Sequence, residues 1–297
     1  FVRLEDGGIL TVDGVNALIS QDAGKTWREQ PIFKDTQSYR IRPERQLIRT
    51  RSGVIILAFM NDAERKWTWS DDLKDAPGAV LPTYAVRSLD GGKTWEEPQK
   101  LHDEWTGAIR DIIQTEKGNI VFTSMQILHD PGRHAVLTYT SGDDGETWQR
   151  SNLIDLGGAG HHDGAMEATL VQLRDGRLWK LIRTTLGRFW QAYSTDERYW
   201  RELSPTDIPA TSAPALVHRL ESGNMVLFWN RPEQHRKELY VMFSKDDAQT
   251  WSSPVMIARK KASLAYPYVF EVAPGEIWLT TMQGKLRVKL READFVE

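Results

Sequence analysis

Cysteine is absent from the 297-residue chain. Disulfide bonds, thiolate metal sites and cysteine nucleophiles are therefore excluded. A cysteine-free chain is compatible with the cytosol, with the periplasm and with secretion, so the composition leaves the compartment open. The first residue is Phe1 rather than Met, which indicates a processed or trimmed chain. If a signal peptide was removed, the protein would be periplasmic or secreted.

Long apolar runs and basic clusters are also absent. No apolar run approaches the roughly 20 residues that a membrane-spanning helix needs, although 40% of the residues are hydrophobic. The net charge is -3 and no long basic run occurs, so the chain lacks the electrostatic footprint of a nucleic-acid-binding protein. We expect neither a membrane nor a nucleic acid as a partner, and the oligomeric state stays open.

Tryptophan, in contrast, is abundant, and several of the 12 copies recur in one motif. The motif is Ser-x-Asp-x-Gly-x-Thr-Trp, an Asp box, which is intact at residues 20–27, 88–95 and 141–148. The copy at 244–251 has Ala248 in the Gly position, and the copy at 194–200 is one residue shorter. Ser and Asp in such a box bond backbone amides, Gly supplies a positive φ, and Trp packs between sheets. We therefore expect the box aspartates to be structural rather than catalytic.

A second repeat consists of two apolar runs joined by a Gly-containing turn, which predicts a β-hairpin. It occurs six times, with separations of 46, 65, 58, 47 and 52 residues between the glycines. These values are close to the roughly 40 to 50 residues of a four-stranded blade with loop insertions. The six turn residues are Gly7, Gly53, Gly118, Gly176, Gly223 and Gly275. The sequence thus predicts an all-β, six-bladed β-propeller with Asp-box repeats, as a single domain over residues 1–297.

Repeated Asp boxes on six predicted blades resemble the sialidase superfamily, and the resemblance covers nearly the whole chain. Because Asp boxes also occur in other glycosidases and in non-enzymatic receptors, they indicate the fold better than the chemistry. The resemblance implies an exo-glycosidase that hydrolyses a terminal α-linked sialic acid or related acidic sugar with retention. It implies a glycan substrate, a Tyr nucleophile and no cofactor.

Two residues occupy the same position in different repeats. Glu167 lies nine residues before Gly176, and Tyr266 lies nine residues before Gly275. Sialidases carry a Glu and a Tyr at similar places, where the Glu acts as base on the Tyr nucleophile. A phenol suits this role because the carboxylate on the anomeric carbon of a sialic acid repels an anionic nucleophile. The alternative is that Glu167 is an ion-paired or solvated strand residue and Tyr266 a packing residue.

A substrate carboxylate requires arginines, whose guanidinium fork binds it bidentately. Of the three arginines that sialidases use, the resemblance matches the second to Arg183, which follows the Glu167 hairpin. It matches the third to Arg236, at the head of the strand that leads into the last Asp box. For both, a surface or structural role is the alternative.

The first arginine has no unique match. Sialidases have an aromatic-Arg-Ile-Pro motif about ten residues before the turn glycine, whereas Arg40, Arg42 and Arg45 lie thirteen, eleven and eight residues before Gly53. Spacing does not choose among the three. Arg110 adds a further candidate contact in the third repeat. Structural or surface roles are again the alternative for each.

The general acid of sialidases is an Asp on a loop after the Ala-Phe strand of the blade that carries the first arginine. Here that strand, residues 56–59, is followed by an insertion at 61–82 that contains Asp62, Asp71, Asp72 and Asp75. We favour Asp75 because it lies nearest the returning strand. Trp67 and Trp69 in the same insertion are candidates for stacking on a sugar, with packing under the loop as the alternative.

A glycine-rich segment before Glu167 contains His161, His162 and Asp163. These side chains are candidates for binding substrate hydroxyls or for proton transfer. Adjacent histidines point in different directions on an extended chain, so their spacing disfavours a metal site.

Two further functions are compatible with the pattern. One is a propeller glycosidase acting on a different sugar, because the displaced first arginine, Arg110 and the His pair imply altered contacts. The other is a non-catalytic glycan-binding propeller. A Tyr266 phenol within hydrogen-bond reach of Glu167, facing two or more arginines, would favour an enzyme. Linkage and natural glycan stay open.

Overall fold

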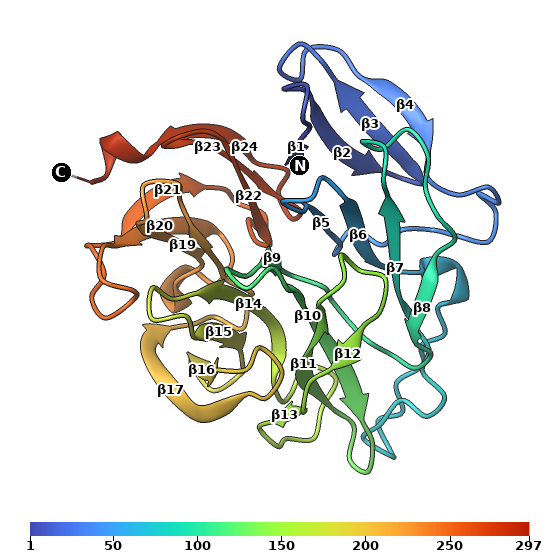
Figure 1. Cartoon of the computed structure of the whole chain (residues 1–297). Coiled ribbons are helices and arrows are strands. Elements are labelled where there is room, and N and C mark those ends of the chain that lie inside the picture. The colour runs from blue at the N-terminus through green and yellow to red at the C-terminus, as the bar shows by residue number, and fades with distance from the viewer. Residues whose placement is uncertain (297) are drawn as a thin grey trace. The chain divides into compact units, whose positions relative to one another are not determined.

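The computed structural model describes residues 1–296, and Figure 1 shows that its regular secondary structure consists almost entirely of β-strands. Within this range there are 24 strands in six antiparallel sheets and three single-turn 3-10 helices. None of the described helices is long and apolar enough to span a membrane. The chain divides into two compact units, residues 1–161 and residues 162–297. That the two form a single domain stays a prediction.

The first unit contains three sheets. In each, consecutive strands pair in sequence order, and the exception is β13, which pairs with β11. The strands of the first sheet are β1 (Val2–Arg3), β2 (Ile9–Asp13), β3 (Asn16–Ser20) and β4 (Arg28–Pro31). The second sheet has β5 (Gln46–Arg49), β6 (Ile55–Met60), β7 (Thr83–Ser88) and β8 (Gln99–His102). The third has β9 (Ile112–Gln114), β10 (Ile120–Leu128), β11 (Arg133–Ser141), β12 (Gln149–Arg150) and β13 (Ile154–Asp155).

The second unit contains the other three sheets, again with strands paired in sequence order. Its first sheet has β14 (Met166–Gln172), β15 (Leu178–Arg183), β16 (Arg188–Ser194) and β17 (Arg201–Pro209). The next has β18 (Leu216–Arg219), β19 (Met225–Trp229), β20 (Glu238–Ser244) and β21 (Val255–Arg259). The last has three strands, β22 (Pro267–Ala273), β23 (Glu276–Thr281) and β24 (Arg287–Arg291).

Each sheet begins with the hairpin that the sequence predicts. All six turn glycines have a positive φ, between 72° and 97°, a backbone region that residues with a Cβ rarely adopt. Six sheets of antiparallel strands, each with its Gly hairpin, confirm the predicted all-β, six-bladed propeller fold. The second strands β6, β15 and β19 are buried along their whole length, as expected for strands covered on both faces.

The Asp boxes close the turn between the third and fourth strands. In the second sheet, Oδ1 of Asp90 accepts from the Thr94 amide at 2.9 Å and Oδ2 accepts from the Thr94 hydroxyl at 2.7 Å. The Ser88 hydroxyl donates to Asp90 at 3.0 Å and accepts from the Gly92 amide at 2.8 Å. The same pattern recurs at Asp22, Asp143 and Asp246. The predicted structural role of these aspartates is confirmed.

Candidate functional site

The second unit places Glu167 and Tyr266 in matching, unusual backbone conformations. Glu167 lies in β14, where the pairing register with β15 shifts, and Tyr266 immediately precedes β22. Their φ angles are 39° and 63°, a region that costs energy for residues with a Cβ and that clusters at functional sites. Both side chains are buried, with 8% and 7% of the residue surface exposed. Residues at the same distance before the turn glycine thus lie at the start of the first strand in two different blades.

The two side chains touch. The Tyr266 hydroxyl donates to Oε1 of Glu167 at 3.0 Å. Burial, followed by the Glu167 carboxylate, raises the pKa of Tyr266, while Arg183 and Arg236 act in the opposite direction. The phenol therefore holds its proton at neutral pH and directs it at a carboxylate that can accept it.

Arg183 contacts both members of this pair. It ends the buried strand β15, and its Nη1 donates to Oε2 of Glu167 and lies 3.5 Å from the Tyr266 hydroxyl. Although burial opposes its charge, Glu167 and Tyr266 raise the pKa of Arg183, which keeps the guanidinium protonated. Arg183 is thus placed to offset negative charge that develops on the phenol oxygen.

Arg236 lies close to the ring of Tyr266. It lies just before β20 and its Nη2 donates to the Ser212 carbonyl at 2.7 Å. Its guanidinium carbon is 5.7 Å from the centre of the Tyr266 ring, within the range of a cation–π contact. The Tyr266 phenol therefore bonds Glu167 and lies close to two arginines. A catalytic role for this pair, and substrate binding by the two arginines, stay predictions.

The remaining candidates of the second unit, His162 and Asp163, lie at its start. His162 is exposed, and Oδ1 of Asp163 accepts from the Thr185 hydroxyl at 3.2 Å. Their contact with substrate stays a prediction.

In the first unit, the three candidates for the first arginine differ in their partners. Arg42 pairs with Glu44 and with Asp62, each at 3.0 Å. Arg45 donates to the Val12 carbonyl, and the exposed Arg40 donates to the Asp62 carbonyl at 3.0 Å. Two carboxylates thus offset the charge of Arg42, and a backbone carbonyl oxygen engages one nitrogen of the Arg45 guanidinium. Carboxylate binding by any of the three stays a prediction.

Arg110 is fully buried just before β9. Its amide donates to the Thr123 hydroxyl at 3.2 Å, as does the amide of Asp111 at 3.0 Å. A contact of Arg110 with substrate stays a prediction.

The insertion at 61–82 is a folded loop. It starts with a 3-10 turn at Asp62–Glu64 and is closed by bridges between Lys66 and Val80 and between Ser70 and Asp75. Of the other loop aspartates, Asp62 pairs with Arg42, Asp71 accepts from the Trp69 indole at 3.2 Å, and Asp72 is exposed.

Asp75, the favoured general acid, is buried and bonded to His129. Its two oxygens lie 2.8 and 3.0 Å from Nδ1 of His129, and Oδ1 accepts from the Ala76 amide at 2.7 Å. Burial raises the pKa of Asp75, but the bonds from His129 and Ala76 outweigh it and leave the pKa lowered. A general acid usually has a raised pKa, so the predicted role, which stays a prediction, would require this pairing to change during the reaction. Nothing in the sequence pattern pointed to His129.

The two tryptophans of the insertion form an aromatic stack with His161. Trp67 lies 4.1 Å from the buried Trp105 and 6.4 Å from Trp69, measured between ring centres. The His161 ring lies 5.0 Å from Trp67 and 5.7 Å from Trp69, and burial lowers the pKa of His161. Trp67 therefore packs against Trp105 under the loop. Stacking of Trp67 and Trp69 on a sugar stays a prediction.

The BNR repeat-like domain family matches residues 14–279. The chain belongs to this family. The match covers most of the sequence and confirms the resemblance read from the Asp boxes. No curated protein sequence matches the chain.

Solved structures share the fold of this BNR-repeat chain at low sequence identity. The NanB sialidase from Streptococcus pneumoniae is 16% identical, with a TM-score of 0.67 over 99% of this chain and 68% of that one. The intramolecular trans-sialidase from Ruminococcus gnavus is 14% identical, with a TM-score of 0.65 over 99% and 94%. The α-L-arabinanase from Penicillium chrysogenum is 12% identical, with a TM-score of 0.64 over 99% and 92%. The fold is therefore that of propeller glycosidases acting on different sugars.

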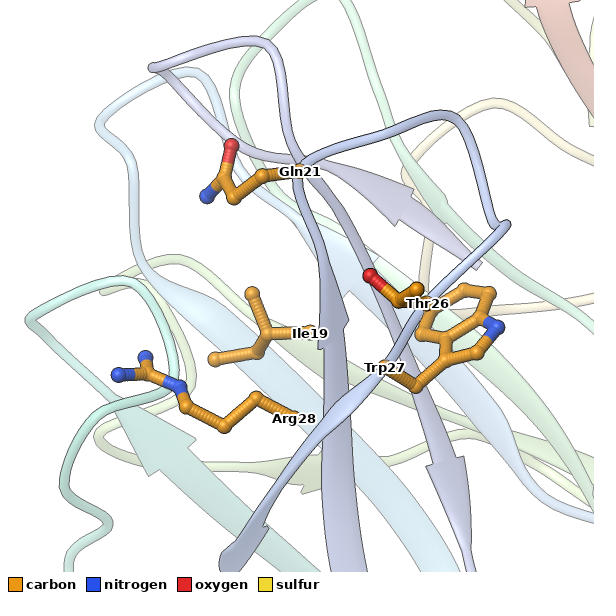
Figure 2. Close-up of a pocket in the computed structure, with 5 residues that line it drawn as sticks. All are labelled: Ile19, Gln21, Thr26, Trp27 and Arg28. Carbon is orange, nitrogen blue, oxygen red and sulfur yellow. The ribbon is translucent and has the colours of Figure 1, made fainter.

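A hollow of about 420 Å³ lies on the first sheet, and none of the candidate site residues lines it. Figure 2 shows the side chains that line it, which come from β3, the first Asp box and the start of β4. The lining residues are Ile19, Gln21, Thr26, Trp27 and Arg28. Because box residues make up this wall, we assign the hollow no catalytic role.

One residue at the Tyr266 site belongs to neither an Asp box nor a predicted Gly hairpin. Ser212, in the irregular connection between β17 and β18, accepts from Nη2 of Arg183 at 3.2 Å through its hydroxyl. Its carbonyl accepts from Arg236. No sequence signal distinguishes it from other loop serines, because its partners lie 29 and 24 residues away along the chain.

Proposed function

We propose that this protein is a retaining exo-glycosidase that hydrolyses a terminal α-linked sialic acid or related acidic sugar. The observation that carries the proposal is the buried 3.0 Å hydrogen bond from the Tyr266 phenol to Glu167, with Arg183 beside both atoms. The family match and the similarity to sialidase structures support it.

The proposed reaction has two displacements. The Tyr266 oxygen attacks the anomeric carbon while Glu167 takes the phenol proton, and the glycosidic bond breaks. The leaving oxygen takes a proton from a general acid, for which Asp75 is the candidate. Water then attacks the anomeric carbon and gives a proton to the carboxylate that the general acid has become, the tyrosyl bond breaks, and Glu167 returns the proton to Tyr266. Two inversions give net retention.

The charge around Tyr266 favours an anionic substrate. Arg183 and Glu167 offset each other as an ion pair. Arg236 forms no ion pair with any described residue and donates to neutral oxygens of Ser212 and Gln283. The half-buried guanidinium of Arg236 thus leaves a positive charge beside the nucleophile, and such a charge attracts a carboxylate.

The test uses the 4-methylumbelliferyl α-glycoside of N-acetylneuraminic acid. Tyr266→Phe should lower kcat by several orders of magnitude with little change in KM, because the nucleophile is lost while the ring stays. Tyr193→Phe is the control, since the Tyr193 hydroxyl bonds only Gln191 among the described contacts, on β16 of the same unit. A fluorinated sialic acid that traps the intermediate should label Tyr266 in mass spectrometry. A label on an Asp or Glu, or full activity of Tyr266→Phe, would contradict the proposal.

A different sugar is the second candidate, favoured by the pairing of Arg42 with two carboxylates in the first unit. An arginine neutralised in this way has little charge to offer an acidic substrate. Turnover confined to neutral aryl glycosides, such as an α-L-arabinofuranoside, would support this candidate. Glycan binding without any turnover would instead indicate a non-catalytic propeller.

A further inference from the structure

A closed circuit of contacts surrounds the Tyr266 phenol within the second unit. Glu167 bonds Tyr266 with one oxygen and Arg183 with the other. Arg183 bonds the Ser212 hydroxyl, the Ser212 carbonyl bonds Arg236, and Arg236 lies over the Tyr266 ring. Ser212 is the only neutral, non-aromatic residue of this circuit, and it connects the two guanidinium groups.

The Ser212 hydroxyl and the Glu167 carboxylate accept from different nitrogens of Arg183. A guanidinium and a carboxylate prefer a bidentate pair with two parallel N–H···O bonds. Such a pair would engage both oxygens of Glu167 and compete with the Tyr266 hydroxyl for Oε1. In the structure only Nη1 of Arg183 reaches Glu167, while Nη2 is turned to Ser212 at 3.2 Å. Oε1 of Glu167 accepts from the Tyr266 hydroxyl and from no nitrogen of Arg183 among the described hydrogen bonds.

The backbone holds Ser212 in place for this contact. Its φ of 45° lies in the left-handed region, which is costly for a residue with a Cβ and persists where the surroundings impose it. The next residue, Ala213, is buried in a small cluster with Ala265 and Tyr266. The segment that carries Ser212 is thus packed directly against the segment that carries Tyr266.

We infer that Ser212 is a positioning residue that keeps Arg183 monodentate on Glu167 and so reserves one carboxylate oxygen for the Tyr266 proton. The inference rests on the proposed function for its effect on turnover, but its geometric part does not. Ser212 acts through Arg183 and does not take part in bond making.

Two substitutions remove the hydroxyl in different ways. Ser212→Ala removes it at an unchanged backbone, and Ser212→Gly removes it while also relieving the positive φ. Both should lower kcat by about 10- to 100-fold with KM changed less than threefold, as expected when reacting groups shift by about 1 Å. Since Glu167 is then held by two bonds from Arg183, the acidic limb of the pH–kcat profile should move to lower pH. A residue needed only for folding would not move this limb.

Ser204→Ala is the matched control. Ser204 lies on β17 of the same unit, is half-buried like Ser212, and accepts from the Gln191 side chain at 3.3 Å. It has no contact with Arg183, so wild-type kcat and an unshifted profile are expected. The probe is the 4-methylumbelliferyl α-sialoside.

Crystal structures of Ser212→Ala and Ser212→Gly give a result that does not depend on turnover. Arg183 should pair with both oxygens of Glu167, and the Tyr266 hydroxyl should lose Oε1. An unchanged Arg183–Glu167–Tyr266 geometry would overturn the inference, as would unchanged kcat in both variants of an active enzyme. A rotated Arg183 in a protein that turns over no acidic sugar would support the inference and overturn the proposed function alone.

Discussion

Lys180 is an ionisable residue of the second unit that has no place in the proposed chemistry. It lies on the buried strand β15 and is completely shielded from solvent. Its Nζ is 3.8 Å from the centre of the Trp200 ring and has no hydrogen-bond partner among the described residues. Burial lowers the pKa of Lys180 well below its ordinary value. The cation–π contact thus replaces only part of the lost hydration.

We predict that Lys180→Met raises the free energy of unfolding at pH 7 by about 1–3 kcal/mol, the typical cost of burying a polar group without a partner. The lowered pKa sets the sign of the pH dependence. Between the folded pKa and the unfolded value of about 10.4, the unfolded state binds more protons, so wild-type stability rises with pH. The advantage of Met should therefore shrink towards pH 10.

Urea unfolding at pH 7 and at pH 9.5 measures this difference. Lys237→Met is the control because Lys237 is exposed, and its stability should change by less than about 0.5 kcal/mol. The prediction would be wrong if Lys180→Met lowered the free energy of unfolding, or if its stabilising effect grew with pH. Either result would show that burying the Lys180 amine costs less than its lack of a hydrogen-bond partner suggests.

Some site residues were predictable from sequence because repeated blades place equal offsets at equal positions. Glu167 and Tyr266 share an offset of nine residues, and the structure brings them together. Ser212 and His129 were not predictable, because both lie in connections between strands and their partners Arg183 and Asp75 are far away along the chain. Such pairings depend on tertiary packing, which no local motif records.

The Asp boxes are the best predicted elements because the hydrogen bonds among their Ser, Asp, Gly and Thr residues form within eight residues. The box at 244–251 shows how far the motif tolerates change. Ala248 adopts a φ of 65° there, close to the left-handed conformation of Gly145 at 80° in the third box. The insertion at 61–82 was predicted only as a loop, since the bridge between Lys66 and Val80 joins residues too far apart for a turn signal.

We predict that Ala248→Gly stabilises the protein slightly. Removing Cβ relieves a left-handed conformation that costs roughly 1–2 kcal/mol. The Ala248 methyl packs against the core of the second unit, and its loss costs about 0.8 kcal/mol. The two effects leave a net gain of at most about 1 kcal/mol, to be measured as the urea midpoint at constant m-value.

The reciprocal variant tests the same element. Gly145→Ala would place a Cβ 2.9 Å from Cδ1 of Ile56 in a left-handed conformation. Strain and a close contact then act together, so this variant should lose more than about 1 kcal/mol. If Ala248→Gly destabilised the protein to a similar extent, the packing of the Ala248 methyl would contribute more to stability than the strain of its left-handed backbone costs.

At the scale of the whole molecule, the open question is whether 1–297 is one domain. Three sheets and their cores lie in each of the two units, so each has buried apolar residues of its own. One domain is expected to unfold in a single transition whose calorimetric and van't Hoff enthalpies agree. Two domains would give two transitions.

Matched box variants report on each unit separately. Asp90 belongs to the first unit and Asp246 to the second, and each accepts bonds from the amide and the hydroxyl of the Thr four residues later. Asp90→Ala should lower the free energy of unfolding by about 1 kcal/mol or more through the loss of these bonds, and Asp246→Ala should lower it in the same direction. For a single domain, both variants lower the same Tm in scanning calorimetry, and the double variant shifts it by the sum because the sites are independent. If Asp90→Ala moved one transition and Asp246→Ala another, the chain would be two domains, and the single-domain prediction would be wrong.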